Sequence, residues 1–89
     1  MDRYEVTEKL KGVVLDNFDI TILSKAVVFD KRDKYDPQHY VYEYPNILKM
    51  NVEKGWTGNN MLVLEFMKNG DAYRQSFFVK SKPKRKEKI

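Results

Sequence analysis

Side chains able to perform acid–base chemistry are scarce in this chain. His39 is the only histidine among the 89 residues. A catalytic histidine needs a nucleophile or an orienting carboxylate within reach, and the neighbouring sequence offers only Asp36 and Tyr40. We therefore interpret His39 as an exposed residue at the edge of a strand, and we expect no enzymatic activity.

Three aspartates spaced by three, Asp30, Asp33 and Asp36, are the candidates for a metal site. Calcium loops place oxygen ligands at alternate positions and use a glycine for the turn. This segment has neither feature, and the three basic residues between its aspartates would repel a cation. The sequence favours a solvated loop over residues 30–38, with no metal and no cofactor.

Two groups of aromatic side chains are candidates for a binding surface. Trp56, the only tryptophan, lies in the glycine-containing segment 54–60, where it is either an interface anchor or a cover for one end of the core. Tyr40, Tyr42 and Tyr44 alternate along a strand and so share one face. We assign Trp56 and these tyrosines to protein binding. Two other uses of the tyrosines stay open, namely stacking on nucleic-acid bases and packing into the core with the hydroxyl groups at the rim.

Basic charge is concentrated at the C-terminus. The chain carries +4 in total, whereas residues 80–89 alone carry +5 and residues 1–79 carry −1. The basic residues of this tail are Lys80, Lys82, Lys84, Arg85, Lys86 and Lys88. Because it is highly charged and contains Pro83, we expect the tail to be disordered. It either engages phosphates of nucleic acid or anionic lipid, or it serves solubility alone.

Length and composition indicate one small domain over residues 1–79. A chain of this size buries roughly 60–65% of its unfolded surface, so the expected core is modest. The absence of cysteine excludes a disulfide framework and fits a reducing compartment. We recognise no secretory leader and no apolar run near the ~20 residues that span a bilayer. We therefore expect a cytoplasmic protein without a transmembrane segment.

The strongest structural signal is Asn69-Gly70. It predicts a β-hairpin with a type I′ turn over residues 60–79, because both residues tolerate a positive φ. A two-residue loop then pairs Lys68 with Asp71, Met67 with Ala72, Phe66 with Tyr73, Glu65 with Arg74, Leu64 with Gln75, Val63 with Ser76 and Leu62 with Phe77. Two of these pairs join opposite charges. One face of the hairpin carries Leu62, Leu64, Phe66, Tyr73 and Phe77.

The N-terminal part of the chain predicts further strands. Apolar and polar residues alternate only weakly over residues 1–10. This segment is predicted to form a first strand, with a helical turn as the alternative, and Gly12 marks a bulge or bend. Turn signals at residues 16–17 and 24–25 predict a three-stranded meander over residues 11–32. One face of this meander collects Val13, Leu15, Phe18, Ile20, Ile22, Val27 and Phe29.

Two more strands are predicted over residues 39–44 and 47–53. In the second strand Leu48, Met50 and Val52 alternate with Lys49, Asn51 and Glu53. Six to seven short strands separated by turns predict an all-β fold, a small antiparallel barrel or sandwich.

The order of these elements resembles the pleckstrin-homology-like superfold in its short microbial or GRAM-like form, over about residues 10–79. The resemblance rests on the meander, the polar loop, a Tyr-x-Pro-x-Ile step around Pro45 and Ile47, and the closing Asn-Gly hairpin. It implies a C-terminal helix that plugs the core. Residues 80–89 have no apolar face, so that cover is absent or comes from the N-terminus or a partner.

Lipid-binding members of this superfold carry basic residues beside the first hairpin loop. This chain has Asp16, Asn17 and Asp19 there, with only Lys9 and Lys11 nearby, so headgroup binding of that kind is not expected. The sequence thus predicts a non-catalytic binding module. It would contact a protein partner or a second copy of itself through a sheet edge and the Trp56 loop. The alternatives are nucleic-acid binding by the tail and the tyrosine face, and peripheral attachment to an acidic membrane.

Overall fold

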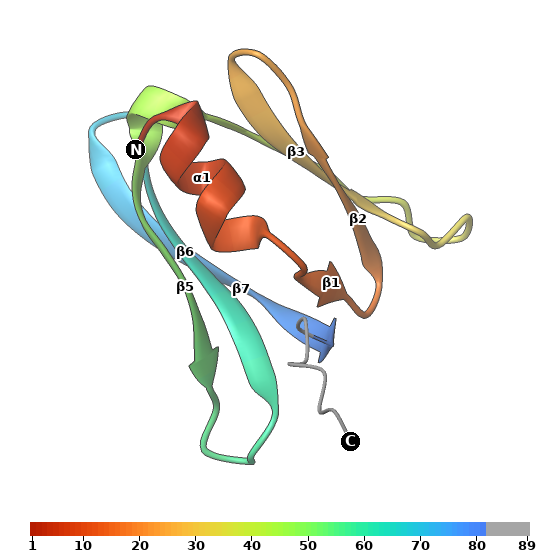
Figure 1. Cartoon of the computed structure of the whole chain (residues 1–89). Helices are drawn as coiled ribbons and strands as arrows, with labels where there is room; N and C mark the ends of the chain where they lie inside the picture. Colours follow the sequence, from red (N-terminus) through yellow and green to blue (C-terminus); the bar gives the residue numbers. More distant parts are fainter. Residues whose placement is uncertain (82–89) are drawn as a thin grey trace.

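The computed structural model describes residues 1–81. In chain order its elements are α1 (Arg3–Leu10), β1 (Val14–Leu15), β2 (Phe18–Ile22), β3 (Ala26–Lys31), β4 (His39–Glu43), the 3-10 turn η1 (Tyr44–Asn46), β5 (Ile47–Lys54), β6 (Asn60–Lys68) and β7 (Asp71–Ser81). The strands form two antiparallel sheets, in the orders β1-β7-β6-β5 and β2-β3-β4. They make an open sandwich rather than a closed barrel (Figure 1), and the all-β prediction is confirmed.

The core lies between the two sheets. Phe29 of β3 and Phe77 of β7 stack across it with ring centroids 4.5 Å apart, and both side chains are buried. All seven apolar residues predicted to share a face within residues 11–32 either belong to the core or pack against it. The alternation that predicted these strands therefore also identified the side chains that the sandwich buries.

The Asn69-Gly70 hairpin forms as predicted. Asn69 has φ 52° and Gly70 has φ 84°, the left-handed values that a type I′ turn needs. β6 and β7 pair in the predicted register from Lys68 opposite Asp71 to Leu62 opposite Phe77. One of the two predicted charge pairs differs in its contacts. Arg74 lies opposite Glu65 as predicted, but Arg74 Nη2 contacts Glu53 Oε1 of β5 at 3.5 Å.

The predicted meander is only partly present. β2 and β3 pair in the register of a two-residue Ser24-Lys25 loop, as expected. β1 instead pairs with β7, so the prediction that it joins β2 is wrong, and the chain passes between the sheets after Leu15. The Arg32 side chain stabilises this passage, since its guanidinium donates to Leu15 O at 3.2 Å and Asp16 O at 2.8 Å.

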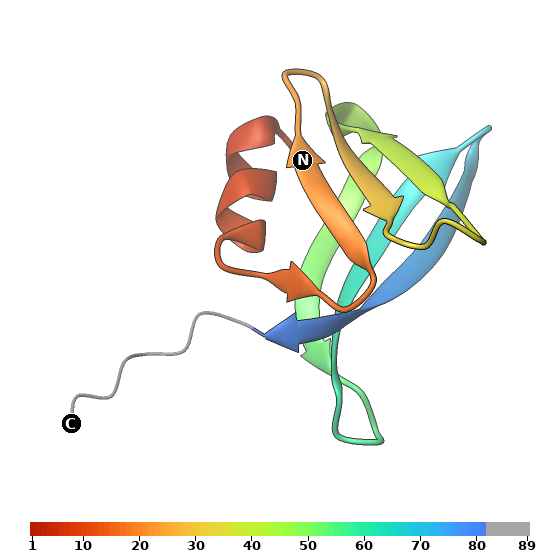
Figure 2. The ribbon, with the colours of Figure 1, turned by 90° about the vertical axis from the view of Figure 1, so that its right-hand side faces the viewer.

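The N-terminal segment is a helix, and the predicted first strand is wrong. Asp2 and Glu5 form a capping box, in which Glu5 N–H donates to Asp2 Oδ1 at 2.8 Å and Asp2 N–H donates to Glu5 Oε1 at 3.0 Å. Val6 and Leu10 lie one turn apart and are both buried. α1 runs alongside β5 and covers the core at that side of the sandwich (Figures 1 and 2). Gly12, at φ 72°, makes the expected bend after the helix.

A bulge at the start of β5 corrects a second prediction. Ile47 lies opposite Phe66 and Lys49 lies opposite Glu65, which leaves Leu48 as the extra residue. Leu48 is 51% exposed, whereas Ile47 and Met50 are buried. The regular alternation that grouped Leu48 with Met50 is therefore wrong at Leu48, because a bulge shifts the alternation by one residue.

β7 is longer than the sequence suggested. The strand runs to Ser81, so Lys80 lies in the sheet rather than beyond it. The other basic residues assigned to the tail, Lys82, Lys84, Arg85, Lys86 and Lys88, lie outside the described residues.

Candidate functional site

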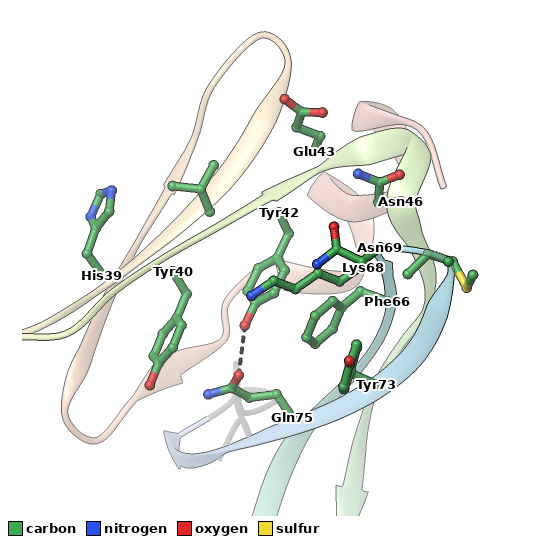
Figure 3. A pocket seen from close by; sticks show the side chains of 13 residues that line it. His39, Tyr40, Tyr42, Glu43, Asn46, Phe66, Lys68, Asn69, Tyr73 and Gln75 are labelled. Atoms are coloured by element: carbon green, nitrogen blue, oxygen red, sulfur yellow. Dashed lines mark hydrogen bonds between the residues drawn. The ribbon is translucent and has the colours of Figure 1, made fainter.

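A groove separates β4 from the tip of the β6–β7 hairpin. It has a volume of about 850 Å³, and Figure 3 shows the side chains that line it. Its lining residues come from β4, η1, β6 and β7, and they are His39, Tyr40, Val41, Tyr42, Glu43, Asn46, Phe66, Met67, Lys68, Asn69, Gly70, Tyr73 and Gln75. A volume of this order matches the clefts in which proteins hold ligands.

Aromatic rings form the inner surface of the groove. Phe66 of β6 and Tyr73 of β7 stack with centroids 5.9 Å apart, and the Tyr42 ring lies 4.8 Å from that of Phe66. Tyr40 stacks beside Tyr42 at 6.4 Å. Phe66 and Tyr73 lie opposite each other in the hairpin register, so the Asn69-Gly70 turn positions both rings.

A hydrogen bond joins the two sheets inside the groove. The Tyr42 hydroxyl donates to Gln75 Oε1 at 2.9 Å (Figure 3). Burial, with a smaller contribution from the charge of Tyr40, raises the pKa of the Tyr42 hydroxyl well above its ordinary range. The phenol is therefore a neutral donor at physiological pH and supplies no base.

The free edge of β4 borders this groove. Within residues 1–81, β4 pairs with β3 and with no other strand. The bond from Lys31 N–H to Gln38 O, 2.8 Å long, sets the order in which β3 and β4 exchange hydrogen bonds. Because antiparallel strands alternate bonded and non-bonded pairs, the backbone N–H and C=O groups of His39, Val41 and Glu43 point away from β3.

The first half of β7 is a second free edge. β1 pairs only with Val79 and Ser81, at the far end of β7. The same alternation, counted from the hairpin turn, directs the backbone groups of Ala72, Arg74 and Ser76 away from β6. The groove thus lies between two strand edges, and both present backbone donors and acceptors without a neighbouring strand in the described structure.

Two pairs of titratable side chains lie where β3 and β4 meet their connecting loop. His39 Nδ1 lies 2.5 Å from Asp30 Oδ1, and both side chains are largely exposed. Lys31 Nζ contacts Asp36 Oδ2 at 3.0 Å, and this bond lowers the pKa of the Asp36 carboxyl and raises that of the Lys31 amine. Over residues 1–81, no cluster of three or more His, Cys, Asp or Glu side chains is arranged to hold a metal.

The structure separates the four aromatic residues that the sequence grouped together. Tyr40 and Tyr42 line the groove, half-buried and buried respectively. Tyr44 is buried elsewhere, with its hydroxyl donating to Leu23 O at 2.5 Å and Ala26 O at 3.0 Å. Trp56 is 99% exposed in the β5–β6 loop, so it does not fold back over the core.

Sequence reasoning missed Phe66, Tyr73 and Gln75 as groove residues. The hairpin register already placed all three side chains on one face. To place these residues in a groove, one must also know that the edge of β7 away from β6 is free along its first half. That depends on where β1 pairs with β7. Alternation predicts which face a side chain occupies, but it does not predict whether another strand covers that face.

Two further findings bear on function. Among residues 1–81, no helix combines the length and the apolar character needed to cross a bilayer. Comparison of the chain with protein-family models, curated proteins and solved structures finds no match.

Proposed function

We propose that this protein is a non-catalytic binding domain that takes an extended segment of a partner protein into the groove beside β4. The segment adds to the sheet as a strand, and the backbone groups of His39, Val41 and Glu43 bond to it. Its inward side chains rest on the rings of Phe66 and Tyr73. This is recognition by strand addition, in which main-chain bonds supply affinity and side-chain pockets supply specificity.

The observation that carries this proposal is that the free edge of β4 borders a groove lined by the aromatic rings of Phe66 and Tyr73. An unpaired edge is a hazard for aggregation, and small proteins usually cover it or place charges along it. β4 is uncovered in the described structure, and its central outward residue is Val41, 51% exposed. Tyr73, which lines the groove, is 47% exposed although its ring is large and mostly apolar. A strand laid along β4 would cover both side chains.

The chemistry of the groove supports binding rather than catalysis. His39 has a carboxylate partner in Asp30, but within residues 1–81 no hydrogen bond joins either side chain to a nucleophile or a second acid. The Tyr42 hydroxyl is held neutral by burial. The remaining groove side chains offer hydrogen bonds and apolar contact, which suit recognition of a peptide.

Nucleic-acid binding by the tyrosine face has less support. Base stacking needs aromatic rings that are accessible on one side. Tyr42 and Tyr44 are 6% and 5% exposed, and Tyr44 is not in the groove. Their packing follows the alternative in which tyrosines fill the core and bond through their hydroxyl groups.

A proline at position 41 tests the proposal. A random peptide library is selected against the native chain, and the affinity of the best peptide is measured for the native chain, Val41→Pro and Val41→Ala. Proline removes the outward N–H of residue 41 but leaves the bonds that Tyr40 and Tyr42 make to β3, as proline at a strand edge can do. We expect Val41→Pro to bind at least about tenfold more weakly, a loss of ~1.4 kcal/mol, and Val41→Ala to bind nearly as well as the native chain.

Hydrogen exchange locates the selected peptide. Bound peptide should slow exchange at the amides of His39, Val41 and Glu43, because these N–H groups become bonded. Equal binding by Val41→Pro and the native chain, or protection elsewhere in the molecule, would contradict strand addition at β4. Sedimentation of the native chain alone separates one further outcome, since a dimer lost in Val41→Pro would identify a second copy as the occupant.

A further inference from the structure

The two strands that border the groove run in opposite directions and match in register. Tyr40 of β4 packs beside Phe77 of β7, with ring centroids 6.1 Å apart. Two residues further along β4, the Tyr42 hydroxyl donates to Gln75, which lies two residues before Phe77. Figure 3 shows this bond crossing from one strand to the other. β4 and β7 are therefore antiparallel across the groove, and their residues match at a constant offset.

This offset also matches the free backbone groups of the two strands. Val41 falls opposite Ser76, and Glu43 falls opposite Arg74. The alternation of antiparallel bonding turns the N–H and C=O groups of these four residues away from the strands that already pair with β4 and β7. Both strands therefore direct their free donors and acceptors to the side on which the groove lies.

The distance between β4 and β7 is too long for direct pairing. In a direct antiparallel pair the Cα atoms lie about 4.5–5.5 Å apart, whereas most Cα atoms of β4 lie more than 8 Å from every Cα atom of β7. Tyr42 and Gln75 meet through the ends of their side chains, so the combined reach of these two side chains limits the separation. One strand between two others needs about 10 Å, twice the spacing of ~4.8 Å between neighbours. These limits leave room for one strand.

The side chains at the tip of the β6–β7 hairpin indicate what such a strand would carry. Phe66 and Tyr73 supply apolar surface, and Lys68 follows Phe66 on the same face of β6. Figure 3 shows the Lys68 side chain extending from the tip over the groove. Lys68 is exposed, and the ion pairs found among residues 1–81 do not include it. An acidic side chain next to an apolar one would complement this end of the groove.

We propose that the partner segment in the groove pairs with both edges, as one strand that joins the two sheets in the order β2-β3-β4-segment-β7-β6-β5. The inference rests on the proposed function and extends it, since addition to β4 alone would leave β7 free. Because β4 and β7 are antiparallel, the segment runs parallel to one of them and antiparallel to the other. It carries an apolar side chain over Phe66 and Tyr73 and an acidic side chain beside Lys68.

Hydrogen exchange in the native chain tests the second edge. The probe is the peptide selected from the random library, and exchange is followed at single amides with and without it. We expect the peptide to slow exchange at Ala72, Arg74 and Ser76 in addition to the free amides of β4. Slowing confined to β4 would overturn the joined sheet and leave the proposed function standing. Slow exchange at both edges without peptide would show that β4 and β7 bond directly to each other, which would also overturn it.

A proline on β7 is the counterpart of the proline on β4. Ser76→Pro removes the outward N–H opposite Val41 and keeps the bonds that Gln75 and Phe77 make to β6. We expect Ser76→Pro to bind the peptide at least about tenfold more weakly than Ser76→Ala, which retains that N–H. Equal binding by these two variants, with the loss in Val41→Pro intact, would overturn pairing with β7 only. Exchange in the native chain decides the question even if Ser76→Pro unfolds.

The charge of the segment is tested at Lys68. The selected peptides should contain Asp or Glu, and Lys68→Gln should weaken binding about two- to fivefold at low salt, the range of an exposed ion pair. Lys49→Gln removes an exposed lysine of β5 that does not line the groove, and it should leave the affinity unchanged. Peptides without an acidic residue, or equal affinities of Lys68→Gln and the native chain, would refute the acidic side chain.

Discussion

The two sides of this sandwich end in different ways. On one side α1 runs along β5, the N-terminal amine donates to Ile47 O at 2.7 Å and to Tyr44 O at 3.2 Å, and Lys9 Nζ donates to Asn51 Oδ1 at 2.9 Å. On the other side, the edge of β4 away from β3 and the edge of the first half of β7 away from β6 have no neighbouring strand in the described structure. A strand edge without a neighbour can pair with a segment of another chain, so the open side is the better candidate for recognition.

The difference also separates stability from binding. Side chains on the closed side, such as Val6 and Leu10, are buried and expose almost no surface to a partner. On the open side, Tyr73 and Val41 keep about half of their surface in solvent. Residues of the first kind should affect the free energy of unfolding, whereas residues of the second kind should affect affinity.

The largest expected effect is on the closed side. Leu10→Ala should lower the free energy of unfolding by about 2–4 kcal/mol, because it opens a cavity under α1. Tyr73→Ala, on the open side, should cost less than about 1 kcal/mol because its ring is already half exposed. Urea denaturation of the two variants measures both values. Similar losses in the two variants would show that the open side is as much a part of the core as the closed side.

A smaller effect is expected at the bond that crosses the groove. Tyr42→Phe removes the hydroxyl that donates to Gln75 and should cost about 1 kcal/mol at neutral pH. Burial raises the pKa of the Tyr42 hydroxyl, so its contribution is complete below about pH 10, the ordinary tyrosine value, and is lost as the pH rises above it. Denaturation curves at increasing pH should therefore show the native chain losing stability faster than Tyr42→Phe above pH ~10. Parallel losses in both chains would exclude this residue as the cause.

The cap of α1 should have a comparable or smaller effect. Asp2→Ala removes the side chain that accepts from Glu5 N–H and should cost about 0.5–1 kcal/mol. Asp2→Ser keeps an acceptor at the same position and should restore most of the loss. Thermal unfolding followed by circular dichroism distinguishes the two variants, and equal melting temperatures would mean that tertiary contacts alone hold the helix.

The smallest effect concerns the exposed ion pair beside the open side. Lys31→Gln should leave stability nearly unchanged, because the Asp36 carboxylate is largely exposed and ion pairs at the surface contribute little. It should raise the pKa of the Asp36 carboxyl toward the ordinary aspartate value, since the bond to Lys31 is the main cause of the lowered pKa. Titration of the Asp36 carboxyl by NMR measures this change. An unchanged titration would show that the pair does not persist in solution.

The sequence by itself determined the local elements of this protein. Asn69-Gly70 specified the hairpin and its register, because few other dipeptides tolerate two consecutive positive φ values. Period-two alternation identified the buried face of β2 and β3. The capping box of Asp2 and Glu5 was also present in the sequence, although the thin alternation over residues 1–10 suggested a strand instead.

Only the tertiary structure decided how the edges are arranged. β1 pairs with β7 through two residues, and this non-local choice leaves the first half of β7 free. The bulge at Leu48 interrupts the regular alternation of β5 and so decides which of its residues face inward. No residue in this segment indicates a bulge from its type alone. The exposure of Trp56 and the burial of Tyr44 likewise depend on what packs beside them. Pairing between distant segments is set by the total burial that the whole chain achieves, and no window of sequence contains that information.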